Sequence, residues 1–385
     1  MGQTKKQHYI TKKLLELFVS NKQIYEYILS SKTSYLTNIS NAMCERNIYE
    51  HIKLDTNTVE NLLASTSDSR LPKAIEKVLI SLESNDIPGA RKVIYENLPD
   101  FIICYFRSGA VLTGLRTSLN KNIEDKKIEK FLSIVGDRKY LLDLSLTIML
   151  GYKFTIIKSS DDNFILSDQY ISTCSLKPKC RFTNVSNRNI GLKDTAILIP
   201  ISSKYYAFLY NRSNDLNLKG NIINRLSKEE TTIINTAIYN NSYYKVAFKN
   251  KDDLKNINKQ KDSIISPMTC IAMFSNNTSV GTVTKKEVFL LKKYKEAYNL
   301  FESCKFINDL NTQRNALCPC GSNKKFKHCC IDKYSIVKEM YNNLKINNQS
   351  NYRISNILTL ERGIPLIEDD YSDIVKFAKE KMSRK

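Results

Sequence analysis

The sequence predicts an α+β protein with a helical N-terminal part, a small mixed sheet with helices in the middle, and a zinc knuckle followed by a helix near the C-terminus. Three observations lead to this class. Apolar residues recur at helical spacing over residues 1–150, short β-rich runs separated by polar turns fill residues 151–250, and four cysteines gather between positions 318 and 330.

Two segments of the N-terminal part carry the helical pattern. "KKLLELFVSNKQIYEYIL", which begins at Lys12, repeats apolar residues at the spacing of one helix face. "LPKAIEKVLISLESNDIPGARKVIYENL" does so twice, and the Pro and Gly of "NDIPG" interrupt it. We therefore expect antiparallel helices that pack on one another.

The middle part reads as strands. "KFTIIK", the polar turn "SSDDN" and "FILSD" together predict a β-hairpin, and "TAILIPISSKYYAFLYN" predicts two more strands around "SSK". "YYKVAFKN" adds another strand. It follows the helical stretch "SKEETTIINTAIYNN", in which Ser227 and Glu230 have the spacing of a capping box.

The C-terminal part begins with a helical segment, "KKEVFLLKKYKEAYNLFESCKF", and a polar linker leads from it into the cysteine cluster. Beyond the cluster, Tyr334, Val337, Tyr341 and Leu344 lie at helix spacing and predict one more helix. The expected parts are an α+β body over 1–310 (helical 1–150, strand-rich 151–250, helical 285–308), a knuckle with its helix over 314–345, and a partly helical tail over 346–385.

Composition limits the classes of partner. The 385 residues carry a formal net charge of +20, from 59 Lys and Arg against 39 Asp and Glu, which favours nucleic acid or an anionic surface. A coding bias toward Lys, spread over solvated surfaces, is the other interpretation. No apolar run reaches the roughly 20 residues of a membrane-spanning helix, and no secretory signal opens the chain, so we expect a cytoplasmic protein.

The cysteine cluster predicts a metal site. Cys318, Cys320, Cys329 and Cys330 offer four thiolates, the ligand set of a closed, structural zinc site that binds one ion. Pro319 stiffens the first pair of ligands. Gly321 permits a sharp turn, and the neighbouring lysines at 324, 325 and 327 can offset the negative charge of the four thiolates.

The remaining cysteines stand singly in the chain. In a reducing compartment we expect them to be small buried side chains, although two of them, six residues apart, could pair or bind a metal. They are Cys44, Cys104, Cys174, Cys180, Cys270 and Cys304, and the close two are Cys174 and Cys180.

"CPCGSNKKFKHCC" resembles the zinc-binding motif at the carboxyl end of the bacterial preprotein translocase ATPase, which recurs on otherwise unrelated bacterial proteins. Asn323 stands where that motif has Gly, and Asn is the residue that next best tolerates left-handed backbone geometry. His328 falls on a variable position of the motif. The resemblance covers about twenty residues and does not extend to translocase function, because no phosphate-binding loop is found in the chain.

The segment "QHYITKKLLELF", which begins at Gln7, resembles the opening of a bacterial family of unknown function whose members begin His-His-Tyr-Val-Pro. "QHYITKKLLELF" fits this opening at His8 and Tyr9, and "FRSGAVLTGLRT", "FILSDQYIS" and "AILIPISSKYYAFL" follow in the order that the family uses. The resemblance covers residues 1 to about 250. It implies no established activity.

Four body residues are candidates for a catalytic site. Asp168 follows the strand "FIL", His8 precedes a helix, and Arg107 and Arg116 could hold a phosphate or carboxylate, so that together they could form a hydrolytic site. In the structural interpretation, which we favour, Asp168 caps a turn, His8 bonds to the backbone and the arginines pair with acidic residues. No nucleophile or ligand spacing links these positions.

The sequence thus supports three functional hypotheses. The first is a zinc-binding cytosolic bacterial protein of unestablished activity, whose basic surface and knuckle bind nucleic acid or a protein partner. The second is a hydrolase, such as a nuclease-like effector or toxin in anti-phage defence, which rests on association alone. In the third, the zinc only staples the tail of an interaction protein.

Overall fold

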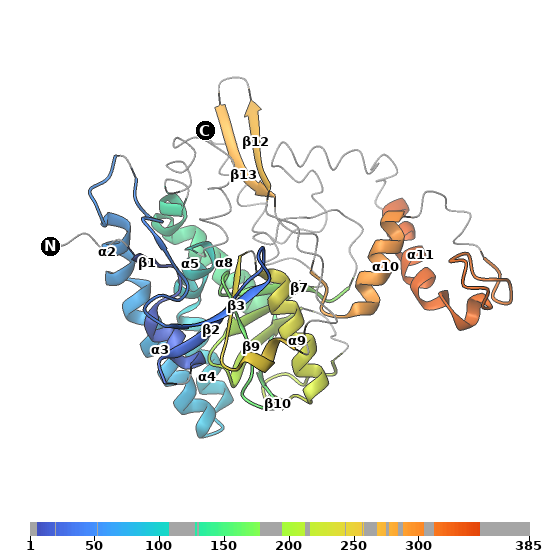
Figure 1. Cartoon of the computed structure of the whole chain (residues 1–385), viewed down its shortest axis with the longest axis horizontal. Helices are drawn as coiled ribbons and strands as arrows, with labels where there is room; N and C mark the ends of the chain where they lie inside the picture. The colour runs from blue at the N-terminus through green and yellow to red at the C-terminus, as the bar shows by residue number, and fades with distance from the viewer. Residues whose placement is uncertain are drawn as a thin grey trace.

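The computed structural model confirms a mixed α and β architecture (Figure 1). The residues that it describes are 6–19, 21–51, 53–107, 128, 131–177, 195–211, 216–242, 244–255, 257, 268–274, 277–283, 288–303 and 312–346. Three residues named above lie outside these ranges: Arg116, Cys180 and Cys304. Of the predicted tail over 346–385, only residue 346, the last of a helix, is described.

The first 50 residues contain more strand than the sequence predicts. Helix α1 (Lys12–Leu15) and a 3-10 turn (Glu16–Phe18) are short, and strand β2 (Gln23–Ile28) follows them, so the long helix predicted from Lys12 is wrong. The helical turn ends at Val19, whose backbone is extended, and Asn21 and Lys22 then adopt left-handed conformations in the turn that leads into β2. The run "QIYEYI" is rich in the β-branched and aromatic residues that favour strands.

Strand β2 pairs with β3 (Thr33–Asn38) in an antiparallel hairpin. A separate two-stranded sheet joins β1 (Lys6–His8) to β4 (Cys44–Arg46). The position of β1 is therefore fixed by its pairing with a strand almost 40 residues further along the chain.

The predicted helical region begins after residue 57. It comprises α2 (Thr58–Ser65), α3 (Ser67–Glu83), α4 (Ile87–Glu96), α5 (Leu98–Arg107) and α8 (Arg138–Gly151). The interruption predicted at "NDIPG" lies between α3 and α4, where the Asp86 side chain accepts a hydrogen bond from the Gly89 N–H. In Figure 1 these helices gather on one side of the strands.

Two sheets form the centre of the body. The larger has the strand order β10-β5-β9-β8-β7, and the smaller has the order β3-β2-β11-β6. Their remaining strands are β5 (Lys153–Lys158), β6 (Leu166–Ser167), β7 (Ser172–Ser175), β8 (Thr195–Pro200), β9 (Tyr205–Tyr210), β10 (Ile223–Arg225) and β11 (Lys245–Phe248). Every residue of β8 and β9 is buried, so both faces of the sheet are covered at these two strands.

Each of the five predicted strand segments contains a strand, and one predicted pairing is wrong. β8 and β9 are the two strands predicted around "SSK", and they pair antiparallel; β11 is the strand expected from "YYKVAFKN". β5 and β6 are not a hairpin, because β5 pairs with β9 and β10 while β6 pairs with β11 in the other sheet. The partner of a strand is set by long-range packing, which local turn signals do not encode.

Helix α9 (Lys228–Asn241) begins with the predicted capping box, in which Ser227 and Glu230 each bond to the other's backbone N–H. Two amide side chains of α9 then complete backbone hydrogen bonds at the sheet edges. Asn235 bonds to the backbone of residues 163 and 165, and Asn241 bonds to both backbone groups of Thr173. The helix is thereby tied to both sheets.

A single hydrophobic core extends from Tyr9 to Leu290 through both sheets and the helices. A second, smaller core joins Phe289 and α10 (Lys292–Ser303) to the cysteine segment and α11 (Ile331–Ile346). The helix assigned to the body by sequence therefore packs on the knuckle's helix, as Figure 1 also shows. A two-stranded hairpin, β12 (Met268–Phe274) and β13 (Asn277–Val283), precedes this part.

No helix in the described ranges is long and apolar enough to cross a membrane. Cys44, Cys104 and Cys174 are buried, as the sequence predicts for isolated cysteines.

Candidate metal centre

The cysteine segment folds as a tight hairpin. The Cys318 N–H donates to the Lys324 carbonyl at 2.8 Å, and the Phe326 N–H donates to the Ala316 carbonyl at 2.8 Å. Gly321 and Asn323 form the turn between them with φ values of 76° and 56°. Asn323 thus adopts the left-handed geometry for which it was expected to substitute for Gly.

The hairpin brings four sulfur atoms together. The Sγ atoms of Cys318, Cys320, Cys329 and Cys330 all lie within 4.8 Å of one another. Cys320 and Cys329 are 3.5 Å apart, and Cys329 and Cys330 are 3.7 Å apart. These separations are far longer than a disulfide bond and close to the roughly 3.8 Å between sulfurs around a tetrahedral zinc with Zn–S distances of about 2.3 Å. The donor set and its spacing fit a soft divalent metal ion.

The thiols have unequal acidity without a metal. The Ser322 hydroxyl, with help from Cys318 and Cys329, lowers the pKa of Cys320 to about 6. Burial raises the pKa of Cys318 and of Cys330. A bound cation must therefore displace the protons of Cys318 and Cys330, because only the thiolate coordinates a metal.

The knuckle is held on a helical hairpin. Phe326 and Tyr334 meet edge to face at 5.1 Å between ring centroids, and Val337 and Ala297 are fully buried beneath them. Glu296 of α10 forms an ion pair with Lys333 of α11, with 2.6 Å between Oε2 and Nζ. The knuckle, α10 and α11 therefore pack as one unit.

A short β-bridge connects this unit to the body. The Ser175 N–H of β7 donates to the Val288 carbonyl at 2.7 Å, and the Leu290 N–H donates back to the Ser175 carbonyl at 3.0 Å. Val288 and Leu290 lie in the large core, whereas Phe289 between them lies in the small core. The bridge therefore joins the two cores at the edge of the larger sheet.

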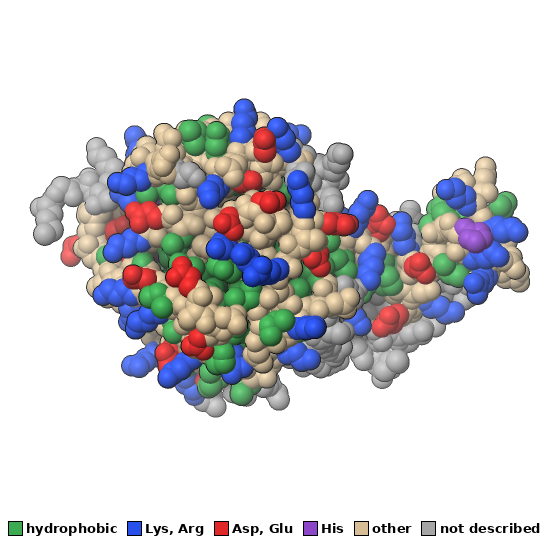
Figure 2. All heavy atoms as spheres, turned by 90° about the horizontal axis from the view of Figure 1, so that it is seen from below, with side chains coloured by type: hydrophobic (Ala, Val, Ile, Leu, Met, Phe, Trp, Pro, Cys, Tyr) green, Lys and Arg blue, Asp and Glu red, His purple; other side chains and the backbone are tan. Residues whose placement is uncertain are grey.

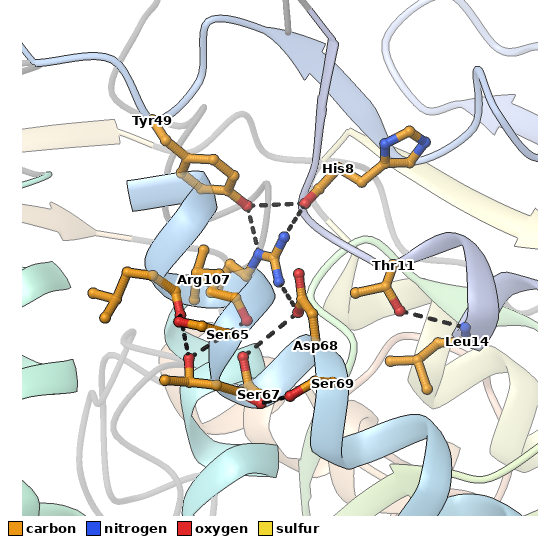
Figure 3. Close-up of polar contacts among 12 residues, drawn as sticks. His8, Thr11, Leu14, Tyr49, Ser65, Ser67, Asp68, Ser69 and Arg107 are labelled. Carbon is orange, nitrogen blue, oxygen red and sulfur yellow. Dashed lines mark hydrogen bonds and ion pairs between the residues drawn. The ribbon is translucent and has the colours of Figure 1, made fainter. Parts of the chain in front are cut away.

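The body candidates have structural contacts instead of forming a site. The Arg107 guanidinium, only 1 % exposed, forms an ion pair with Asp68, donates to the His8 carbonyl and donates from Nε to the Tyr49 hydroxyl at 2.7 Å (Figure 3). Its Cζ also lies 5.3 Å from the Tyr49 ring centroid. Burial alone would lower the pKa of Arg107, but Tyr49 and Asp68 raise it above its usual value. Arg107 thereby fastens β1 to α3 and α5.

The side chains of His8 and Asp168 are also engaged elsewhere. Figure 3 shows that the His8 imidazole points away from Arg107, and its Nε2 lies 3.3 Å from the Ile39 carbonyl oxygen. Asp168 is fully buried and accepts hydrogen bonds from the N–H groups of Tyr244 at 2.8 Å and Lys245 at 3.1 Å. Asp168 therefore caps the start of β11, and the contacts agree with the structural interpretation of these residues. Arg116 lies outside the described residues.

Burial of His8 makes a pH-dependent contribution to stability. Desolvation lowers the pKa of the imidazole from 6.5 to about 4, so the unfolded chain binds the proton first and the folded state loses stability as pH falls from about 6.5 toward 4. We expect His8→Gln to reduce the loss of unfolding free energy between pH 7 and pH 5 by about 1 kcal/mol, allowing for the partial exposure of the ring. Urea titrations of both proteins at the two pH values measure this difference. Identical pH dependence would contradict it.

Sequence reasoning missed one polar cluster in the body. Glu26 is fully buried in β2, where its carboxylate accepts from the Tyr35 hydroxyl at 2.5 Å and from the Met43 N–H at 2.8 Å. Lys245 lies 3.8 Å from Glu26 and 3.6 Å from Glu45. The only local signal is a carboxylate inside the apolar run "QIYEYI", and its partners come from distant segments.

The fold and the site together define a class: an α+β body joined to a carboxyl-terminal unit whose four cysteines could hold a metal ion. The family model "Protein of unknown function (DUF4238)" matches residues 6–252, and the SEC-C motif matches residues 314–331. The chain therefore belongs to the DUF4238 family and carries a SEC-C motif, which confirms both resemblances predicted from the sequence. No curated protein and no solved structure gives a significant match.

Proposed function

We propose that the chain is a zinc-binding protein whose knuckle holds one structural Zn²⁺ on Cys318, Cys320, Cys329 and Cys330 and presents a basic surface to nucleic acid. The observation that carries the proposal is the geometry of the hairpin. Its sulfurs converge on one point while its cations face outward. Four thiolates leave no open position on a tetrahedral ion, so the metal would support structure and not catalysis.

The outer surface of the hairpin supports the choice of partner. Arg314, Lys324 and Lys325 are exposed, and Leu317 beside them is 67 % exposed. Figure 2 shows Lys and Arg side chains clustered around this end of the molecule. Cations that project from a compact hairpin can contact successive phosphates, and the exposed apolar side chain can pack on a sugar or base.

We expect the triple variant Arg314→Glu, Lys324→Glu, Lys325→Glu to bind nucleic acid more weakly than the native chain. It should also reduce the slope of log affinity against log salt by about 2 to 3, since each lost phosphate contact removes 0.7 to 0.9. Fluorescence anisotropy with a labelled oligonucleotide over a salt series measures both effects.

The matched control places the same charge change on exposed body lysines, Lys73→Glu, Lys77→Glu, Lys251→Glu. Equal loss of affinity in the two variants would show that net charge and not the knuckle governs binding. Unchanged affinity in the knuckle variant would reject the proposal and leave a protein partner or a purely structural zinc staple.

The hydrolase and anti-phage hypotheses receive no comparable support. The side chains of His8, Arg107 and Asp168 hold backbone and acidic groups, and the family matched by the body has no assigned activity. The predicted cytoplasmic localisation and bacterial origin stay predictions.

A further inference from the structure

A groove of about 790 Å³ opens on the body, well apart in sequence from the knuckle. It lies between α4, the junction of α8 with β5, and the turn at Gly220 and Asn221. The lining residues on which the inference rests are three cations and three aromatic side chains: Arg91, Lys92, Lys153, Tyr95, Tyr152 and Phe154.

The floor of the groove is aromatic and fixed. Tyr152 and Phe154 are buried at the start of β5. Tyr95 of α4 is half-buried and meets Phe154 edge to face, with ring centroids 5.8 Å apart and an interplanar angle of 80°. This contact holds the Tyr95 ring in one orientation, so it can receive a second flat ring by stacking.

The rim of the groove is basic. Lys92 and Lys153 are exposed, and Arg91 donates from Nη1 to the Asn221 side-chain oxygen at 2.9 Å. Asn221 is itself fixed, because its N–H donates to the Phe154 carbonyl at 2.8 Å. Arg91 thus has a preset direction with further N–H donors to offer.

One carboxylate, that of Glu96, lines the groove together with the three cations. Glu96 lies 4.0 Å from Lys92 across one helical turn. Lys153 has no ion pair among the described residues. The groove therefore has an excess of positive charge beside an aromatic surface. Figure 2 views the molecule from the end at which α4 and β10 lie, and there Lys and Arg side chains border hydrophobic ones.

We propose that this groove binds a phosphorylated ligand with one aromatic ring, of the size of a mononucleotide. Arg91 and Lys153 bind the phosphate, and Tyr95 stacks on the base. The volume falls within the roughly 300 to 1,000 Å³ of ordinary ligand pockets. Guanidinium and ammonium groups are the usual phosphate ligands, and every base has a face that stacks on tyrosine. The inference does not depend on the knuckle's partner.

Calorimetric titration of the full chain with the four nucleoside monophosphates tests the proposal. At least one should bind, and its nucleoside alone and inorganic phosphate alone should each bind at least about tenfold more weakly, because each offers half of the recognised chemistry. Lys153→Glu should weaken nucleotide binding by about tenfold or more, whereas Lys77→Glu, an exposed charge reversal on α3, should change it less than about twofold.

A short single-stranded oligonucleotide distinguishes the two sources of this chemistry. Tighter binding of the oligonucleotide than of the monophosphate, lost in Lys153→Glu, identifies the ligand as a unit of a single strand. Tighter binding of the monophosphate identifies a free nucleotide. Absence of binding by all four monophosphates, or equal affinity in the native chain and Lys153→Glu, would overturn the proposal.

A second variant reports on the ring. Because the chain contains no Trp, Tyr95→Trp creates a protein with a single tryptophan at the groove. Nucleotide should quench its fluorescence with the affinity found by calorimetry. Leu36→Trp, at a position 46 % exposed on β3, should not respond. Equal quenching at both positions, or none at Trp in the groove, would contradict stacking on residue 95.

Discussion

Replacing Cys318 by serine is expected to unfold the knuckle while the body stays folded. Cys318 is the most buried of the four cysteines, and its own N–H closes the hairpin on Lys324. For small structural zinc sites the metal-binding free energy is the folding free energy, about 10 to 16 kcal/mol in isolated zinc-finger peptides. Loss of one ligand should therefore remove most of the order of residues 316–330.

Hydrogen exchange is the suitable readout, because a chain with two cores need not unfold in one step. In Cys318→Ser the backbone amides at positions 318 and 326 should exchange at least about 100-fold faster than in the native chain, while the exchange rates of the amides in β8 and β9 should not change. Chelation of the native protein should have the same effect.

The matched control is Cys44→Ser, a cysteine buried in the body far from the cluster. It should leave zinc content and knuckle exchange unchanged. Full protection of the knuckle in Cys318→Ser would contradict a structural role for the metal.

Of the substitutions that neutralise one charged side chain in the body, Asp68→Asn is expected to cause the largest loss of unfolding free energy. Asp68→Asn leaves the Arg107 guanidinium buried without its counterion, since the side chain is 1 % exposed and its other partners, Tyr49 and the His8 carbonyl, are uncharged. Removing one partner of a buried ion pair costs about 3 to 5 kcal/mol. We expect about 3 kcal/mol, because Asp68 is 18 % exposed and Asn can still accept a hydrogen bond.

The control for this prediction is Asp252→Asn, which breaks a pair with Lys255 in which both side chains are more than 70 % exposed. That change should alter the unfolding free energy by less than about 0.5 kcal/mol. Urea titration followed by far-UV circular dichroism measures both variants. A loss below 1 kcal/mol in Asp68→Asn would mean that the Arg107 network does not hold β1 on the helices.

The sequence predicts those features that are written in neighbouring residues. The metal cluster, the left-handed turn at Asn323, the capping box at Ser227 and the two strands around "SSK" each lie within a few residues, and all appear in the structure. In each case the chemistry of a short segment determines its local geometry.

Features that depend on distant partners are not predictable in this way. The run at 23–28 fits helical and strand periods alike, and its pairing with β11, more than 200 residues away, decides the outcome. The same holds for the Arg107 network and for the groove, whose cations at 91 and 153 meet only through the packing of α4 on β5. Candidate sites built from single residues therefore need the fold before they can be judged.

The central claim is that four thiolates bind one zinc ion, and X-ray absorption spectroscopy of the purified full chain tests it most directly. We predict one zinc per chain with four sulfur ligands at about 2.3 Å and no nitrogen ligand. Cys318→Ser should lose the ion, and His328→Ala should leave the spectrum unchanged. A shell that includes imidazole nitrogen, or a chain that retains no metal, would contradict the account.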